Sequence, residues 1–190
     1  FDALSGGAQV ASGNTFTTPA LSTTTTYYAE ARAFGAIAKL GPSNPNTQLG
    51  VKGLQNYQGF VNFTVNSNTS LQSVDIFPIA SGQSGQLVIR NSSNITLASF
   101  TFTTSVSGGN TLQQINMNYT LIPGMYNLYF STLPASGLRM NTTNAAYPYT
   151  SSVASIDGNS IDGNFNLGAY NWKFTTECLS ARVPVAATVT

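Results

Sequence analysis

The chain has 190 residues, of which only 7% are charged, and its formal net charge is +1. Its seven basic residues form no run, which excludes the basic patches that bind nucleic acid or acidic lipid. The absence of histidine and the single cysteine, Cys178, exclude histidine triads, histidine metal sites, zinc clusters and internal disulfides.

Hydrophobic residues make up 42% of the sequence and include eleven Phe and nine Tyr, which argues against disorder despite the many Ser, Thr and Asn residues. No apolar run approaches the roughly 18 residues that cross a bilayer, so we expect no membrane insertion. Because the chain begins at Phe1 without Met or a signal-like segment, we expect it to be a processed or excised piece of a longer protein.

The first 33 residues contain short β segments separated by turns. A Gly-rich turn at residues 5–7 predicts a hairpin within the first ten residues. Residues 23–32, TTTTYYAEAR, combine β-branched and aromatic residues and predict a strand, although a low-complexity linker remains an alternative for Thr23–Thr26. The tail at residues 179–190, LSARVPVAATVT, has the same two-residue period. We predict that this tail pairs with residues 23–32 in one sheet.

These two segments carry a resemblance. The first 31 residues, FDALSGGAQVASGNTFTTPALSTTTTYYAEA, resemble the central and late strands of Ig-like repeats in large secreted Bacteroidetes surface proteins of the type IX secretion kind. The tail fits the last strand of such repeats, Cys-x-Ser-x-Arg-x-x-Val-x-Ala-Thr-Val. Its matching residues are Cys178, Ser180, Arg182, Val185, Ala187, Thr188 and Val189. In those repeats the two strands follow each other closely, whereas here residues 33–177 intervene.

The resemblance also implies a defect at the N-terminal side. The repeat's first strands, which carry the usual partner of the late cysteine, are missing before Phe1, so Cys178 is expected to be unpaired. A sandwich without those strands would expose sheet edges and apolar side chains such as Val10, Phe16 and Val183. We therefore expect this region to contact another segment or chain along a strand edge.

Residues 34–56 are rich in Gly and Pro, which predicts a connector with at most one short strand. From Tyr57 onward, apolar and polar residues alternate in many short segments, most clearly from Ile115 to Leu121, and this pattern is typical of half-buried strands. A change of register after Leu97 predicts a bulge near Ala98–Ser99.

Residues 57–176 resemble a β-sandwich module of jelly-roll type that accompanies Ig-like repeats and peptidases in the same secreted proteins. We therefore predict an all-β protein in which a jelly-roll-like β-sandwich is inserted in the last hairpin of a partial Ig-like β-sandwich. The expected domains are residues 1–33 with 177–190, a connector at 34–56, and the inserted module at 57–176.

One group of residues has the chemistry of a glycan site, in which aromatic faces stack on sugar rings and amide or guanidinium groups bind hydroxyls. The candidates are Arg139, Asn141, Tyr147, Tyr149 and Trp172. The alternative is that Trp172 belongs to the core and Tyr147-Pro148-Tyr149 forms a rigid corner.

Two further patterns are candidates for a calcium site and for glycosylation. The Asp157-Gly158-Asn159 and Asp162-Gly163-Asn164 segments offer oxygen ligands for calcium, but they lack the EF-hand pattern and Asp-Gly is a common hairpin turn, so we predict no metal and no cofactor.

Six Asn-x-Ser/Thr sequons are possible glycosylation sites, at Asn62, Asn68, Asn91, Asn94, Asn118 and Asn141. A chain this rich in Asn, Ser and Thr contains about four or five such sequons by chance, so their number alone does not identify a glycoprotein.

The six acidic residues are spread along the sequence, so nothing local suggests the paired carboxylates of a hydrolase, and we predict no enzymatic activity. Two functional classes remain. The first is a non-catalytic extracellular or cell-surface binding or adhesion module of a larger protein, with polysaccharide as a possible partner. The second is a structural repeat or fibre subunit that pairs strand edges with neighbouring copies or repeats.

Overall fold

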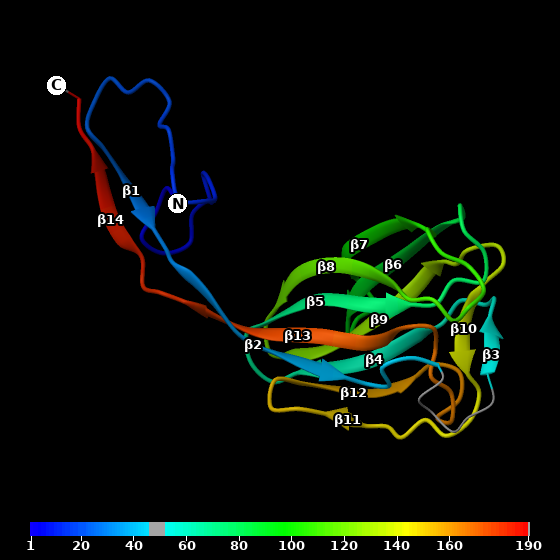
Figure 1. Ribbon diagram of the computed structural model, residues 1–190. Coiled ribbons are helices and arrows are strands. Elements are labelled where there is room, and N and C mark those ends of the chain that lie inside the picture. Colours follow the sequence, from blue (N-terminus) through cyan, green and yellow to red (C-terminus); the bar gives the residue numbers. More distant parts are fainter. Residues whose placement is uncertain (46–51, 190) are drawn as a thin grey trace. The chain divides into compact units, whose positions relative to one another are not determined.

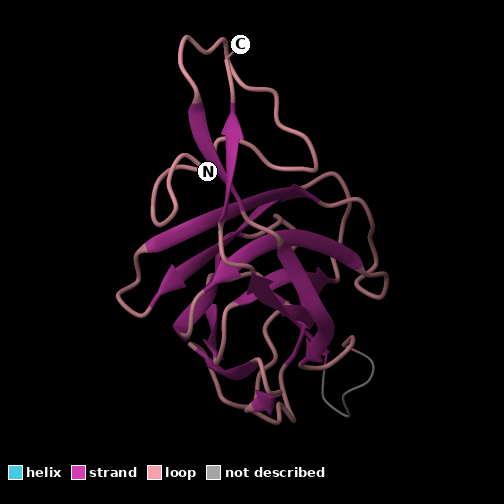
Figure 2. Ribbon diagram, turned by 90° about the vertical axis from the view of Figure 1, so that its left-hand side faces the viewer, coloured by secondary structure: helices cyan, strands magenta, loops and turns pink. Residues whose placement is uncertain are grey.

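The structure, a computed structural model, describes residues 1–45 and 52–189. No helix occurs among these residues, and the described elements are strands joined by loops and turns (Figure 2). This confirms the prediction of an all-β protein. The chain divides into two compact units, one formed by residues 1–34 with 177–190 and the other by residues 35–176.

The first unit contains one antiparallel strand pair. Strand β1 (Thr25–Ala29) pairs with β14 (Val183–Ala187), so that Tyr27 lies opposite Val185 and Tyr28 opposite Pro184 (Figure 1). This confirms the predicted pairing of residues 23–32 with the C-terminal tail. On the other edge of β1, Phe1 and Tyr28 exchange two backbone hydrogen bonds, of 2.8 and 2.9 Å.

Arg182 ties the N-terminal segment to this strand pair. Its guanidinium lies 3.5 Å from the ring centroid of Phe1, donates to the Ala3 carbonyl at 2.7 Å, and reaches the Glu30 carboxylate at 3.3 Å. The hairpin predicted within the first ten residues is not formed. Asp2 instead closes a loop by bonding twice to Ala8. Its backbone NH donates to the Ala8 carbonyl, but its carboxylate, rather than a backbone carbonyl, accepts from the Ala8 NH, so no strand ladder forms.

The second unit is a sandwich of a six-stranded and a four-stranded sheet. The larger sheet has the order β11-β12-β4-β9-β6-β7 and the smaller one β2-β13-β5-β8. The larger sheet consists of β4 (Phe60–Val65), β6 (Ser84–Asn91), β7 (Thr96–Thr103), β9 (Gly124–Thr132), β11 (Tyr149–Thr150) and β12 (Ala154–Asn159). The smaller sheet consists of β2 (Arg32–Leu40), β5 (Thr69–Ile76), β8 (Gln113–Leu121) and β13 (Tyr170–Leu179). A separate pair joins β3 (Lys52–Gln55) to β10 (Leu138–Asn141).

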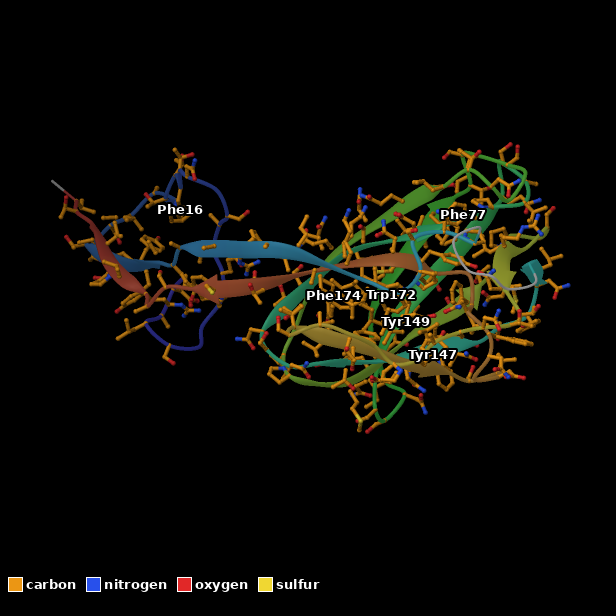
Figure 3. The ribbon with its side chains drawn as sticks, turned by 60° about the horizontal axis from the view of Figure 1, so that its bottom comes forward. Phe16, Phe77, Tyr147, Tyr149, Trp172 and Phe174 are labelled. Carbon is orange, nitrogen blue, oxygen red and sulfur yellow. The ribbon has the colours of Figure 1, made fainter. Side chains whose placement is uncertain are left out.

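The core lies between the two sheets and is supplied by alternate residues of each strand. Phe63 packs against Trp172 and Phe174, with ring centroids 5.4 and 6.0 Å away, and Figure 3 shows Trp172 and Phe174 beside each other on β13. The predicted alternation in β8 is confirmed, since Ile115, Met117 and Leu121 are buried while Asn116 is exposed. Chain connections cross between the sheets at β4–β5, β5–β6, β7–β8 and β8–β9, as a sandwich requires. The β-sandwich is therefore confirmed, whereas the jelly-roll type and the insertion into a host hairpin stay predictions.

Two local features differ in detail from the sequence interpretation. The bulge lies at Leu97, because Ile89 faces Ala98 and Arg90 faces Thr96, one residue before the predicted position. Residues 34–56 are not only a connector, since most of β2 and all of β3 lie within them. Residues 46–51 of this segment lie outside the described residues.

Candidate functional site

The glycan cluster predicted from the sequence is mostly internal. Trp172 is 1% exposed and its indole NH donates to the Ala169 carbonyl at 3.2 Å, so it is a core residue. Asn141 is fully buried, where its amide donates to the Pro45 carbonyl and its oxygen accepts from the Tyr170 hydroxyl. A side chain whose polar atoms are all bonded inside the protein is not available to a sugar hydroxyl. The prediction that Trp172 and Asn141 form a sugar platform is therefore corrected.

The two tyrosines of the cluster form the alternative structure, a packed corner. The rings of Tyr147 and Tyr149 meet edge to face with centroids 5.2 Å apart, and burial raises the pKa of Tyr147. The Tyr149 hydroxyl donates to the Asn166 amide oxygen at 3.1 Å. The space that these rings border, together with Trp172, has a volume of about 10 Å³, which is room for a single water at most. No pyranose ring fits there.

Arg139 also lies outside any open site. It is half-buried on β10, and Gly109 lies so close to it that a Cβ there would come within 2.8 Å of the guanidinium Nε. The buried Nε of Arg139 has no hydrogen-bond partner among the described residues. The five sequence candidates thus do not converge on one surface.

The sequons differ in accessibility. Four of the six asparagines are exposed: Asn62, Asn68, Asn94 and Asn118. Asn91 is half-buried, and its side-chain oxygen accepts from the backbone NH groups of Ser93 and Ile95, both at 3.0 Å. Asn141 is buried and bonded as described above, which corrects its interpretation as a glycosylation site because an attached glycan must reach solvent.

Each acidic side chain has a separate hydrogen-bond or ion-pair partner. Each of the six carboxylates has its own non-acidic partner, and these partners are Ala8 for Asp2, Arg182 for Glu30, Asn171 for Asp75, Thr64 for Asp157, Asn164 for Asp162 and Arg32 for Glu177. No group of three or more metal-ligating side chains occurs in the described part of the chain. The Asp157 oxygens accept from the Thr64 and Ser155 hydroxyls, so this carboxylate links the neighbouring strands β4 and β12. The absence of activity and of a metal nevertheless stays a prediction.

An open groove that contains none of the five sequence candidates lies at one end of β6 and β7. Its volume is about 430 Å³, and its lining residues are Ser84, Gly85, Gln86, Thr101, Phe102, Thr103 and Thr132. Apart from Gly85 and Phe102, every lining residue offers a hydroxyl or an amide. Such a lining can donate and accept several hydrogen bonds without carrying any charge.

Strand alternation places this groove on the outer face of the larger sheet. On β6, Leu87 and Ile89 are fully buried, so Ser84, Gln86, Val88 and Arg90 project from the opposite face, where Val88 alone is buried. Gly85 lies opposite Phe102 in the register, and an added Cβ at Gly85 would meet the Phe102 ring at 2.3 Å. The glycine therefore makes room for the ring on the inner side, and this packing fixes the strand ends that carry the groove.

The same outer face continues from the groove to an aromatic residue and an arginine. Tyr129 lies opposite Val88 in the register, and the Arg90 guanidinium carbon lies 3.7 Å from the centroid of the Tyr129 ring. The Tyr129 hydroxyl donates to the Gln58 oxygen at 2.6 Å, and the Gln58 amide donates to the Ser131 carbonyl at 2.7 Å. Ser131 in turn donates to the Gln86 side-chain oxygen at 2.8 Å. These bonds fix the polar side chains between the groove and Arg90.

A usable signal for this face was present in the sequence. Between residues 84 and 90, polar Ser84, Gln86 and Arg90 share one side of the strand with the apolar Val88, while the opposite side has no polar side chain. What the sequence does not show is the register that sets Thr101 and Thr132 beside Gln86 and Tyr129 beside Val88. Those neighbours come from strands that are distant in the chain.

The described residues include no helix long and apolar enough to cross a membrane. Comparison with curated proteins finds no match to the chain. Residues 1–37 match the model of a family described as Ig-like domain, CHU_C associated. The match covers β1 and the beginning of β2 and does not extend into the rest of the sandwich. The N-terminal segment is thus similar to an Ig-like repeat of Bacteroidetes-type proteins, which supports the resemblance found in the sequence and suggests an extracellular module of a larger protein.

Proposed function

We propose that the chain is a non-catalytic binding module of a larger extracellular or cell-surface protein, and that it binds polysaccharide on the outer face of its six-stranded sheet. The similarity of residues 1–37 to an Ig-like repeat supports the extracellular setting. Fold class alone does not identify a ligand, so we assign the ligand from the chemistry of this face.

The main observation in support of this proposal is the groove of about 430 Å³ at the end of β6 and β7. Five of its seven lining residues carry hydroxyl or amide groups. A sheet holds such groups at fixed spacings of about 4.8 Å across strands and about 6.6 Å along every second residue. A polysaccharide presents hydroxyls at regular intervals, so a rigid array of neutral donors and acceptors is a suitable surface for it. An apolar ligand would leave these polar groups without partners, which is unfavourable.

The openness of the groove also fits a polymer better than a small molecule. Small-molecule sites are concave and enclose most of the ligand, and they are mostly apolar. This groove is open, and five of its seven lining residues carry a hydroxyl or an amide. Arg90 lies farther along β6 on the same face of the sheet. A chain of sugars can enter and leave such a surface at both ends.

The test is a screen of purified polysaccharides by affinity electrophoresis and calorimetry. The double substitution Thr101→Ala with Thr103→Ala removes two exposed hydroxyls from the groove, and a several-fold loss of affinity is expected. The matched control is Thr111→Ala with Thr120→Ala, which removes two exposed hydroxyls elsewhere in the unit and leaves affinity unchanged. Equal affinity of both variants for a bound polysaccharide would contradict this location of the site.

A second candidate function is supported by the first unit. None of the described apolar side chains in residues 1–34 and 177–190 is buried, and Val183 and Val185 on β14 are 59% and 52% exposed. Exposed apolar strands are sites of pairing with other chains. We propose as the alternative that this strand pair assembles with a neighbouring copy or repeat. Sedimentation at increasing concentration, with Val183→Lys as the variant, distinguishes the two, and a monomer at all concentrations would count against assembly between copies.

A further inference from the structure

We infer that the polysaccharide bound by the outer face is acidic, and that Arg90 binds its carboxylate or sulfate group. This inference rests on the proposed function and names the chemical class of its ligand. It starts from the charge distribution of the larger sheet. Among the residues of the four adjoining strands β4, β9, β6 and β7, Arg90 is the single charged one.

In the described part of the structure Arg32 and Arg182 have acidic partners, whereas Arg90 and Arg139 have none. Arg32 and Arg182 form ion pairs with Glu177 and Glu30, at 2.8 and 3.3 Å. Arg90 forms no ion pair and no side-chain hydrogen bond in the described part of the structure, and its contact is the stack on Tyr129. An arginine held over an aromatic ring keeps the edge of its guanidinium available for two parallel bonds to an anion.

The environment of Arg90 favours an anion. Its Nε is buried without a hydrogen-bond partner among the described residues. A cation that has lost part of its hydration gains more from an anionic partner than one in open solvent. The nearest carboxylate on this face is that of Asp157, on β12. It is three strands away, which is about 14 Å, and its two oxygens already accept from hydroxyls. At physiological ionic strength a charge at that distance is largely screened.

The position of Arg90 relative to the groove suits a polymer. Gln86 and Arg90 lie on the same face of β6, four residues apart, which is about 13 Å along the strand. A sugar chain that occupies the groove at Gln86 and follows the strand therefore brings a later ring to Arg90. Neutral hydroxyls would bind in the groove, and an acidic substituent would bind at the arginine. The position of Arg90 then sets which repeating unit is accepted.

The experiment compares matched charged and neutral polymers. Polygalacturonate is compared with its methyl ester, and dextran sulfate with dextran, so that the two pairs separate a carboxylate ligand from a sulfate ligand. The expected result is that one acidic polymer binds the wild-type chain at least ~10-fold more tightly than its neutral counterpart, and that this preference weakens with added salt. Preference for the neutral polymer, or equal affinity, would overturn the inference.

Substitutions then locate the effect. Arg90→Gln is expected to lower affinity for the acidic polymer ~10-fold or more and to leave affinity for the neutral one unchanged. Arg90→Lys keeps the charge but not the planar fork, so an intermediate loss is expected. Tyr129→Phe keeps the ring beneath the guanidinium but removes the hydrogen bond to Gln58, so the preference for the acidic polymer over the neutral one should remain. If Arg90→Gln does not fold, the comparison of charged and neutral polymers on the wild-type chain still tests whether the ligand is acidic, and Arg90→Lys tests the role of the arginine.

The outcomes separate this inference from the proposed function. Binding of neutral polymers that depends on Thr101 and Thr103 but not on Arg90 would refute the acidic ligand and preserve the polysaccharide module. Acidic preference that Arg90→Gln does not change would refute the role of Arg90. Failure of every polysaccharide to bind would refute both.

Discussion

Trp172 gives the sharpest test of the division between core and surface. It is 1% exposed, stacks with Phe174 at 6.2 Å, meets Phe63 edge to face, and donates to the Ala169 carbonyl. Substitution of a buried tryptophan by alanine removes this packing and leaves a cavity, which costs ~3–5 kcal/mol. Trp172→Phe keeps most of the ring packing but leaves the buried Ala169 carbonyl without its donor, at a cost of ~1–3 kcal/mol.

The free energy of unfolding is measured by guanidinium denaturation followed by circular dichroism. Because Trp172 is the chain's single tryptophan, the wild-type fluorescence also reports directly on its burial. A stability loss of this size lowers the melting temperature by on the order of 10 °C for a unit of this length. The control is Met125→Ala, which alters a residue that is 66% exposed and should change stability by less than ~0.5 kcal/mol. A loss below ~1 kcal/mol for Trp172→Ala, or a native emission spectrum typical of tryptophan in water, would refute the assignment to the core.

Three other outcomes are expected. Gly85→Val should cost ~1–3 kcal/mol, because its Cβ would overlap the Phe102 ring, and Phe102→Ala should recover part of that loss; additive losses in a double-mutant cycle would contradict this contact. Burial raises the pKa values of Tyr147 and Tyr170 above those of the unfolded chain. The unfolded chain therefore loses these protons first, and the folded state loses stability as the pH rises above ~10. Spectrophotometric titration should show these two tyrosines ionising only with unfolding, and their ionisation in the folded protein would contradict it. When the chain is expressed in a glycosylating host, mass spectrometry should find glycans at exposed sequons such as Asn62 or Asn118 and none at buried Asn141; occupancy of Asn141 would show that its burial is wrong.

The strands of the sandwich could be predicted where side chains alternate clearly. Residues 60–65 and 113–121 have one apolar face each, and the structure buries those faces. The same rule, applied to residues 170–174, sets Trp172 on one side with Tyr170 and Phe174, opposite Asn171 and Lys173. The local pattern therefore favoured the core position of Trp172. The glycan prediction gave more weight to residue type than to this alternation.

Strand β2 was missed for a reason that the sequence does not show. Gly35 argued against a strand, yet an added Cβ at Gly35 would come within 2.1 Å of the Thr176 Oγ1, so the glycine is what permits β13 to approach. The Gly35 carbonyl also accepts a 2.7 Å hydrogen bond from the Thr175 hydroxyl. These partners are about 140 residues away in the chain. A local sequence pattern does not reveal a contact between residues that far apart. The groove escaped prediction for the same reason, since its walls come from three strands.

The edges of the sandwich also bear on how a ligand can bind. Strand β7 is the last strand of the larger sheet, and such an edge ordinarily offers its backbone to a foreign strand. Here the Gln113 side chain of β8 donates to the Thr103 carbonyl and accepts from the Ser105 NH, both at 2.8 Å, so this one side chain occupies the end of the edge. Backbone pairing at that end is blocked, while the neighbouring Thr101 and Thr103 side chains remain exposed on the sheet face. At this end of β7 the Gln113 side chain takes the place of a foreign strand, which is consistent with the proposed recognition of a polysaccharide through side chains.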